Sequence, residues 1–111
     1  MSSWTVVCPL SGLVPERGVT ALVDGEQVAV FRLDDDRVVA VQQRDPFSGA
    51  NVISRGIVGS VGTVPTVTSP MYKQVWDLTT GRCLDPVGKE PADLRMFAVS
   101  VESGQVRVAR W

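Results

Sequence analysis

Hydrophobic residues recur in short runs along the chain, and most of these runs are rich in valine. Valine favours extended backbone, because its branched Cβ packs well on a pleated surface. Apolar and polar positions alternate around Val28–Val30 and Val106–Val108, which indicates strands with one buried face. No stretch of about 12 residues shows the period of an amphipathic helix. The pattern predicts strands at residues 4–10, 18–24, 27–33, 37–43, 63–69, 72–78, 96–102 and 105–111.

Turn signals separate the predicted strands. The pairs Asp24-Gly25 and Ser103-Gly104 are typical of two-residue hairpins, in which the turn residues adopt positive φ. The acidic run at residues 34–36 and the pair Thr80-Gly81 mark further turns. Short strands with frequent turns predict an all-β fold, an antiparallel sandwich or barrel forming a single domain over residues 1–111.

Two longer stretches interrupt this rhythm, at residues 44–62 and 79–95. The first is irregular and rich in glycine, and loops of this length in a compact domain often carry function. Within the second we expect a single helical turn at residues 89–96, after Pro91. The pattern alone therefore describes an all-β domain with one elaborate pair of loops.

Charge and hydropathy exclude several classes of protein. The chain has 11 basic and 12 acidic residues, a net charge of −1, whereas nucleic-acid-binding domains usually show a clear basic excess. No apolar run approaches the roughly 20 residues that span a bilayer. The first residues lack the basic and apolar regions of a secretory signal, so we expect a cytoplasmic protein. In that reducing compartment Cys8 and Cys83 are expected to be free thiols; the alternative is a disulfide between them.

The chain contains no histidine. Ser-His and Cys-His nucleophiles are therefore excluded within it, as are imidazole ligands for a metal. The two cysteines are too few for a four-thiolate site. We accordingly predict neither catalytic residues nor a metal site on this chain.

Three other features each have a functional and a structural interpretation. The acidic run at residues 34–36 is either a cation site or a solvated turn, and its spacing is not that of a calcium loop. The glycines of residues 56–62 form either a phosphate-binding loop or a flexible bend, and a phosphate loop needs a helix after it. The tryptophans are either stacking platforms or packing residues, and we favour packing for Trp4, Trp76 and Trp111.

The two irregular stretches contain a pair of related motifs. Residues 45–50 read DPFSGA, and residues 69–83 read SPMYKQVWDLTTGRC. Together they resemble the two loops of a Rieske-type iron–sulfur domain, in which two cysteines and two histidines hold a [2Fe–2S] cluster. The scaffold residues of the family are present at Pro46, Gly49, Ala50, Pro70, Asp77, Leu78, Thr80, Gly81 and Cys83. The four ligand positions are occupied by Asp45, Phe47, Ser69 and Tyr72.

This chain, with Rieske-like loop motifs but no cluster ligands, is similar to the small subunits of the NAD(P)H-dependent assimilatory nitrite reductases. The resemblance implies a Rieske-like fold with a two-loop tip and no cofactor on this chain. It also implies a non-catalytic accessory role beside a large subunit that carries FAD, an iron–sulfur cluster and sirohaem and reduces nitrite to ammonia. Two alternatives remain: a Rieske-type ferredoxin that carries electrons, and a Rieske-like interaction module for another oxidoreductase.

In Rieske proteins the loop tip faces the redox partner, so the resemblance also implies a docking surface here. Its predicted members are Arg44, Phe47, Arg55, Met71, Tyr72 and Lys73. Aromatic side chains are typical anchors of interfaces, and basic ones complement an acidic partner. The alternative is that Phe47 and Tyr72 fill the former cluster cavity and that the basic residues are plain surface charges. Asp45, Ser69 and Tyr72 are expected to form hydrogen bonds across the gap between the loops.

Overall fold

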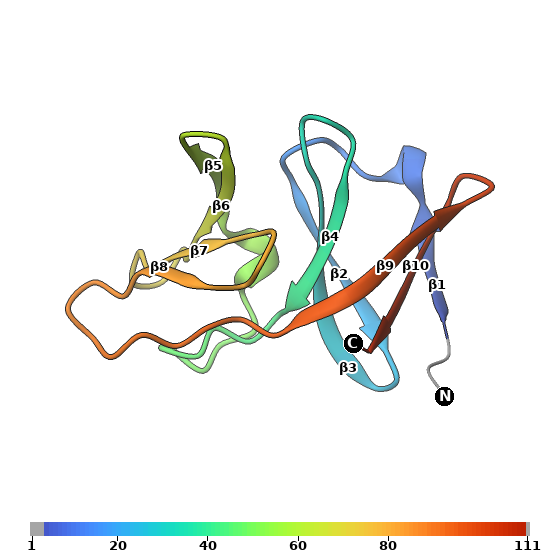
Figure 1. Ribbon diagram of the computed structural model, residues 1–111. Coiled ribbons are helices and arrows are strands. Elements are labelled where there is room, and N and C mark those ends of the chain that lie inside the picture. The colour runs from blue at the N-terminus through green and yellow to red at the C-terminus, as the bar shows by residue number, and fades with distance from the viewer. Residues whose placement is uncertain (1–3, 111) are drawn as a thin grey trace.

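The computed structural model describes residues 4–110, which form two antiparallel sheets and two short 3₁₀ helices (Figure 1). The strands are β1 Thr5–Pro9, β2 Gly18–Val23, β3 Glu26–Arg32, β4 Val38–Gln42, β5 Ile57–Val61, β6 Val64–Thr68, β7 Val75–Asp77, β8 Cys83–Asp85, β9 Met96–Glu102 and β10 Gln105–Arg110; the helices are η1 Leu10–Gly12 and η2 Ile53–Arg55. The predicted all-β class is confirmed. No helix within residues 4–110 has the length and apolar character needed to cross a membrane.

The larger sheet has the strand order β1-β10-β9-β4-β3-β2. Its edge strands β1 and β2 also contact each other, so the sheet curls into a nearly closed barrel. Both predicted hairpins are present. Asp24 and Gly25 join β2 to β3 with φ of 51° and 81°, and Ser103 and Gly104 join β9 to β10 with φ of 51° and 75°. Positive φ at both turn residues matches the right-handed twist of the flanking strands.

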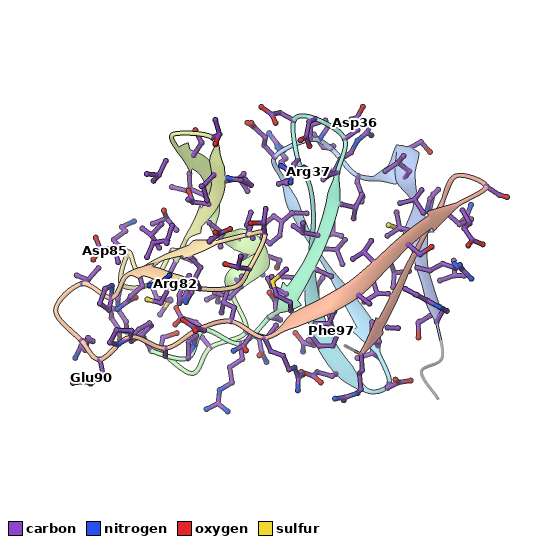
Figure 2. All side chains as sticks on the ribbon, viewed as in Figure 1. Asp36, Arg37, Arg82, Asp85, Glu90 and Phe97 are labelled. Atoms are coloured by element: carbon purple, nitrogen blue, oxygen red, sulfur yellow. The ribbon has the colours of Figure 1, made fainter. Side chains whose placement is uncertain are left out.

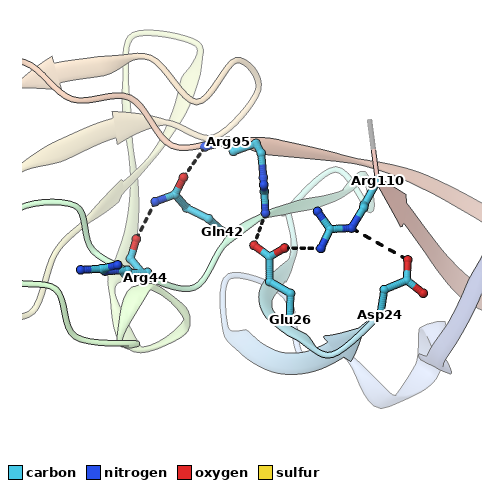
Figure 3. Close-up of polar contacts among 6 residues, drawn as sticks. All are labelled: Asp24, Glu26, Gln42, Arg44, Arg95 and Arg110. Carbon is cyan, nitrogen blue, oxygen red and sulfur yellow. Dashed lines mark hydrogen bonds and ion pairs between the residues drawn. The ribbon is translucent and has the colours of Figure 1, made fainter. Parts of the chain in front are cut away.

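The smaller sheet has the order β5-β6-β7-β8 and is inserted between β4 and β9, which are neighbours in the barrel. Figure 1 shows it beside the barrel, together with the long loop that leads back to β9. The side chain of Gln42 joins the two ends of the insertion (Figure 3). Its Nε2 donates to the carbonyl of Arg44 at 2.8 Å, and its Oε1 accepts from the backbone N–H of Arg95 at 2.7 Å.

Strand β3 is buried on both faces, and this differs from the single buried face that its alternation indicated. Val28 and Val30 point into the barrel core, whereas Ala29 and Phe31 pack into a second core beneath the smaller sheet. The difference arises because residues distant in sequence cover the outer face of β3. The second core also contains Trp76, and it supports the loops described below.

Three local predictions are wrong. Strands β5 and β8 lie in stretches that were expected to be irregular, and residues 72–74 precede β7 rather than forming part of it. Gly59 lowers the strand propensity of β5, and β8 has only 3 residues. Residues 90–95 contain no helical turn.

Tertiary contacts hold residues 90–95 in their non-helical path. The indole Nε1 of Trp76 donates to the carbonyl of Ala92 at 2.8 Å. The backbone N–H of Cys83 donates to Asp93 Oδ1 at 2.8 Å, and that of Leu94 donates to the carbonyl of Gly81 at 2.8 Å. Each bond joins the segment to β7, to β8 or to the turn between them, so the local sequence does not decide its conformation.

Of the two tryptophans that the structure describes, Trp76 is a packing residue and Trp4 is a partly exposed residue outside both cores. Trp76 is fully buried in the second core. Trp4 is 42% exposed, and the guanidinium of Arg107 lies over its ring at 5.3 Å from the centroid. Trp111 lies outside the described residues.

Candidate functional site: a Rieske-like loop pair without cluster ligands

The first loop is closed by hydrogen bonds of Asp45, whose side chain is fully buried. The backbone N–H of Asp45 donates to the carbonyl of Ala50, and that of Gly49 donates to the carbonyl of Asp45, each at 2.8 Å. The carboxylate Oδ1 accepts from the N–H groups of Phe47 at 2.8 Å and Ser48 at 3.3 Å. Gly49 has φ of +77°, which only glycine adopts without strain.

The second loop is closed in a similar way by Ser69, which is 1% exposed. Its backbone N–H donates to the carbonyl of Gln74 at 2.8 Å, and its Oγ accepts from the N–H of Met71 at 3.1 Å. Lys73 completes the turn with φ of +70°, a conformation that non-glycine residues adopt infrequently.

A direct hydrogen bond joins the two loops. Ser69 Oγ donates to Asp45 Oδ2 at 2.5 Å, and both side chains are buried. Hydrogen bonds to a carboxylate are shorter and stronger than those between neutral groups. These residues occupy the positions of the two cysteine ligands in the family motif, so we refer to Asp45 and Ser69 as the loop clasp.

The two aromatic residues at the former histidine positions have different environments. Phe47 is partly buried against the second core, and its ring lies 5.9 Å from that of Trp76, at an angle of 40°. Tyr72 is 55% exposed, and its neighbour Met71 is 45% exposed. The structure therefore places Phe47 as packing and leaves Tyr72 accessible at the surface.

We expect this difference to separate the two aromatic residues in experiments. Phe47→Ala should lower the free energy of unfolding by about 1–3 kcal/mol, since it removes a ring only partly withdrawn from water. Tyr72→Ala should change stability by no more than about 0.5 kcal/mol, as is usual for exposed positions. Urea denaturation of both variants checks this. Equal destabilisation by the two substitutions would contradict it.

The residues at the four ligand positions do not fit an iron–sulfur cluster. Rieske clusters are held by thiolates and imidazoles. Here Asp45 is engaged by the first loop and by Ser69, Phe47 has no ligand atom, and Tyr72 offers only a phenol. Within residues 4–110, no group of three His, Cys, Asp or Glu residues could hold a metal ion.

The residues of the predicted docking surface do not all lie in one groove. Phe47, Tyr72 and Lys73 line the same groove at the tip. Arg44 lines a separate polar hollow with Glu26 and Gln42, as Figure 3 shows in part. Arg55 is exposed at the end of η2 and lines neither hollow.

The groove at the tip includes three residues that the sequence analysis did not identify: Gln74, Val87 and Lys89. Val87 and Lys89 belong to a turn after β8, in which the N–H of Val87 donates to Asp85 Oδ1 at 2.9 Å. The Asp-Pro pair at residues 85–86 is a recognisable turn signal. Its position beside the ligand loops depends on the long-range contacts of residues 90–95.

The remaining candidate features are structural. Asp35 and Asp36 belong to a solvated turn between β3 and β4, where Figure 2 labels Asp36 and Arg37. Asp35 pairs with Arg37, and Asp36 pairs with Arg32. Hydrogen bonding by the backbone N–H of Arg37 lowers the pKa of Asp35. The glycines of residues 56–62 precede, belong to or follow strand β5, and the structure has no helix between them and residue 110.

The two cysteines lie in different sheets and are free thiols, as expected. Cys83 is buried in the second core, and Cys8 is partly buried in β1. Burial raises the pKa of the Cys8 thiol. Neither cysteine belongs to the loop clasp or to the groove at the tip.

Comparison with known proteins decides the family. The family model for the Rieske-like [2Fe-2S] domain matches residues 3–109. The chain belongs to the Rieske-like [2Fe-2S] domain family. The resemblance inferred from the two loop motifs is thereby confirmed, and this member carries Asp45, Phe47, Ser69 and Tyr72 at the ligand positions.

Several proteins that align with nearly the whole chain at 35% identity or more are named small subunits of nitrite reductases. The nitrite reductase (NADH) small subunit of Escherichia coli is 35% identical over 109 residues, covering 97% of this chain and 98% of that subunit. A crystal structure described as an NADH-dependent nitrite reductase small subunit from Mycobacterium tuberculosis is 46% identical, with a TM-score of 0.91. It covers 100% of this chain and 97% of that one.

A Rieske-like segment of the same kind also occurs within a much longer protein. The nitrite reductase [NAD(P)H] large subunit of Klebsiella oxytoca is 41% identical over 105 residues. The match covers 95% of this chain but only 11% of that protein.

Proposed function

We propose that this chain is the non-catalytic small subunit of a cytoplasmic assimilatory nitrite reductase that uses NAD(P)H to reduce nitrite to ammonia. The observation that carries the proposal is the end-to-end match with a nitrite reductase small subunit, over 97% of one chain and 98% of the other.

The partner is a separate large subunit. In the Klebsiella oxytoca protein, a segment 41% identical to this chain belongs to the polypeptide named as the large subunit. Two domains joined in one polypeptide are held at a high effective concentration. This arrangement supports a working association between the same two components where they are separate chains.

The proposal assigns no cofactor to this chain and places FAD, sirohaem and the iron–sulfur cluster on the large subunit. The absence of histidine and the loop clasp support the first part of this assignment, that this chain holds no cluster. The ferredoxin alternative requires a cluster, and the four ligand positions do not provide its ligands. The end-to-end match also favours nitrite reductase over another oxidoreductase as the partner.

The role proposed for the two-loop tip is docking to the large subunit. Met71, Tyr72 and Lys73 are exposed on the second loop. Arg44 and Arg55 are also exposed, and they lie close to the first loop in the sequence. Phe47 lies on the first loop and packs against the buried ring of Trp76. Exposed aromatic and basic residues of this kind suit recognition of another protein.

Co-purification tests the proposal. A tagged form of this chain, produced with the large subunit of the same organism, should retain that subunit and contain no iron of its own when isolated alone. A brown protein with stoichiometric iron would establish the ferredoxin alternative. Capture of a different oxidoreductase, with no retention of the large subunit, would establish the interaction-module alternative.

A further inference from the structure

We propose that the groove at the loop tip binds an extended acidic segment of the large subunit. The inference rests on the proposed function and names the kind of segment that the groove recognises. We refer to the groove as the tip groove; its volume is about 640 Å³, and it is lined by Phe47, Tyr72, Lys73, Gln74, Val87 and Lys89.

Three segments that are distant in sequence build the tip groove: the first loop, the second loop and the turn after β8. Phe47, Tyr72 and Val87 make part of its lining apolar, and Val87 is 48% exposed. Val87 also has φ of +53°, which is an outlier for a β-branched residue. Strained backbone conformations of this kind cluster at binding sites.

A buried polar atom in the lining of the tip groove lacks a partner. Gln74 is 1% exposed, and its Oε1 accepts no hydrogen bond from any described residue. Buried side-chain polar atoms in native proteins nearly always have a partner, because an unmet hydrogen bond is unfavourable. The oxygen is enclosed in the isolated chain, so rotation of the Gln74 side chain toward the groove would let an N–H donor of a partner segment supply the missing bond.

The charges around the tip groove indicate an acidic occupant. Lys73 and Lys89 are exposed, and neither forms an ion pair with a described residue. Five arginines pair with carboxylates: Arg32, Arg37, Arg95, Arg107 and Arg110. The other four, Arg17, Arg44, Arg55 and Arg82, form no ion pair with a described residue and lie outside the groove. Two unpaired ammonium groups flanking one groove suit a ligand that carries carboxylates.

These observations together define the segment. It is extended, since an extended backbone presents free N–H groups, and one of these reaches Gln74 Oε1. It carries at least one Asp or Glu side chain for Lys73 and Lys89. It also carries an apolar side chain, which packs against Tyr72 and Val87.

The first test reverses the charge of the tip groove. Binding of the purified large subunit to Lys73→Glu/Lys89→Glu should be weaker by roughly tenfold or more at low salt, and the loss should shrink as salt rises. Arg17→Glu/Arg82→Glu is the matched control, because it changes the net charge by the same amount and both arginines are exposed and unpaired among the described residues but lie outside the groove. The control should bind like the unmodified chain, and equal weakening by both changes would overturn the proposal.

The second test addresses Gln74. Gln74→Met keeps the side-chain length and removes the unpartnered oxygen, so the isolated chain should melt at the same temperature or higher. Binding of the large subunit should nevertheless weaken by roughly fivefold or more. A lower melting temperature with unchanged binding would show a purely structural role for Gln74 and overturn the proposal.

The outcomes separate the two levels of inference. If the unmodified chain fails to bind the large subunit, the proposed function fails. If it binds, and the groove variants bind equally well, only the tip-groove proposal fails. The other possible occupant of the groove is a second copy of this chain, and sedimentation of the chain alone tests it. A dimer that dissociates in Lys73→Glu/Lys89→Glu would overturn the assignment to the large subunit.

Discussion

Asp45→Ala is expected to lower the free energy of unfolding by about 3 kcal/mol, because hydrogen bonds to a buried charged group are strong and their loss leaves donors unpaired. The substitution removes the acceptor of the N–H groups of Phe47 and Ser48 and the acceptor of the Ser69 hydroxyl. Against a typical total stability of roughly 5–15 kcal/mol, this loss is large. Urea denaturation measures it, and the melting temperature should fall by roughly 10–20 °C.

A double-mutant cycle isolates the clasp itself. Asp45→Ala, Ser69→Ala and the double variant should give a coupling energy of about 1–3 kcal/mol, since the two side chains share one charge-assisted hydrogen bond. Asp45→Asn is the conservative control, because it retains a carbonyl oxygen for the N–H groups of the first loop. Additive effects of the two alanine substitutions would show that the loops are held together by other contacts.

Trp76→Ala is expected to cost about 4 kcal/mol, as is usual for removal of a large buried aromatic side chain. Trp76 is the largest fully buried side chain among residues 4–110, and it contacts both sides of the tip. Its ring contacts Phe47 of the first loop, and its Nε1 donates to Ala92 in the segment that leads back to β9. Calorimetry or chemical denaturation of the variant measures the loss.

Trp76→Phe distinguishes the two contributions of this residue. It keeps an aromatic ring beside Phe47 but removes the donor to Ala92, so its cost should be about 1–3 kcal/mol. Its binding to the large subunit should also weaken, because the lost bond to Ala92 holds the segment that follows Val87 and Lys89, two residues that line the tip groove. A variant that loses stability while its binding is unchanged would contradict the link between Trp76 and the groove.

The fold was largely predictable from the sequence where local signals suffice. Valine alternation identified the strands of the barrel, and Asp24-Gly25 and Ser103-Gly104 gave both hairpins, because the turn chemistry is local. Strands β5 and β8 were missed because their local sequence signals are weak. One contains glycine and the other is very short, and their pairing depends on partners elsewhere in the chain.

The candidate site was predictable in its position but not in its detail. The motifs at residues 45–50 and 69–83 located the two loops, and the exchange of all four ligand residues was visible in the sequence. The environment of Phe47 was not visible, because it depends on Trp76, a residue of the distant strand β7. Gln74, Val87 and Lys89 carried no motif, and only the folded chain brings them to one groove.

Reconstitution of nitrite reduction tests the central claim most directly. The large subunit, purified without this chain, is assayed for NAD(P)H-dependent reduction of nitrite to ammonia while the iron-free chain is added in increasing amounts. We expect the rate to rise and to saturate at a fixed ratio of the two chains, although the added chain carries no cofactor. A rate unaffected by the iron-free chain, or increased only after iron and sulfide are built into it, would contradict the account.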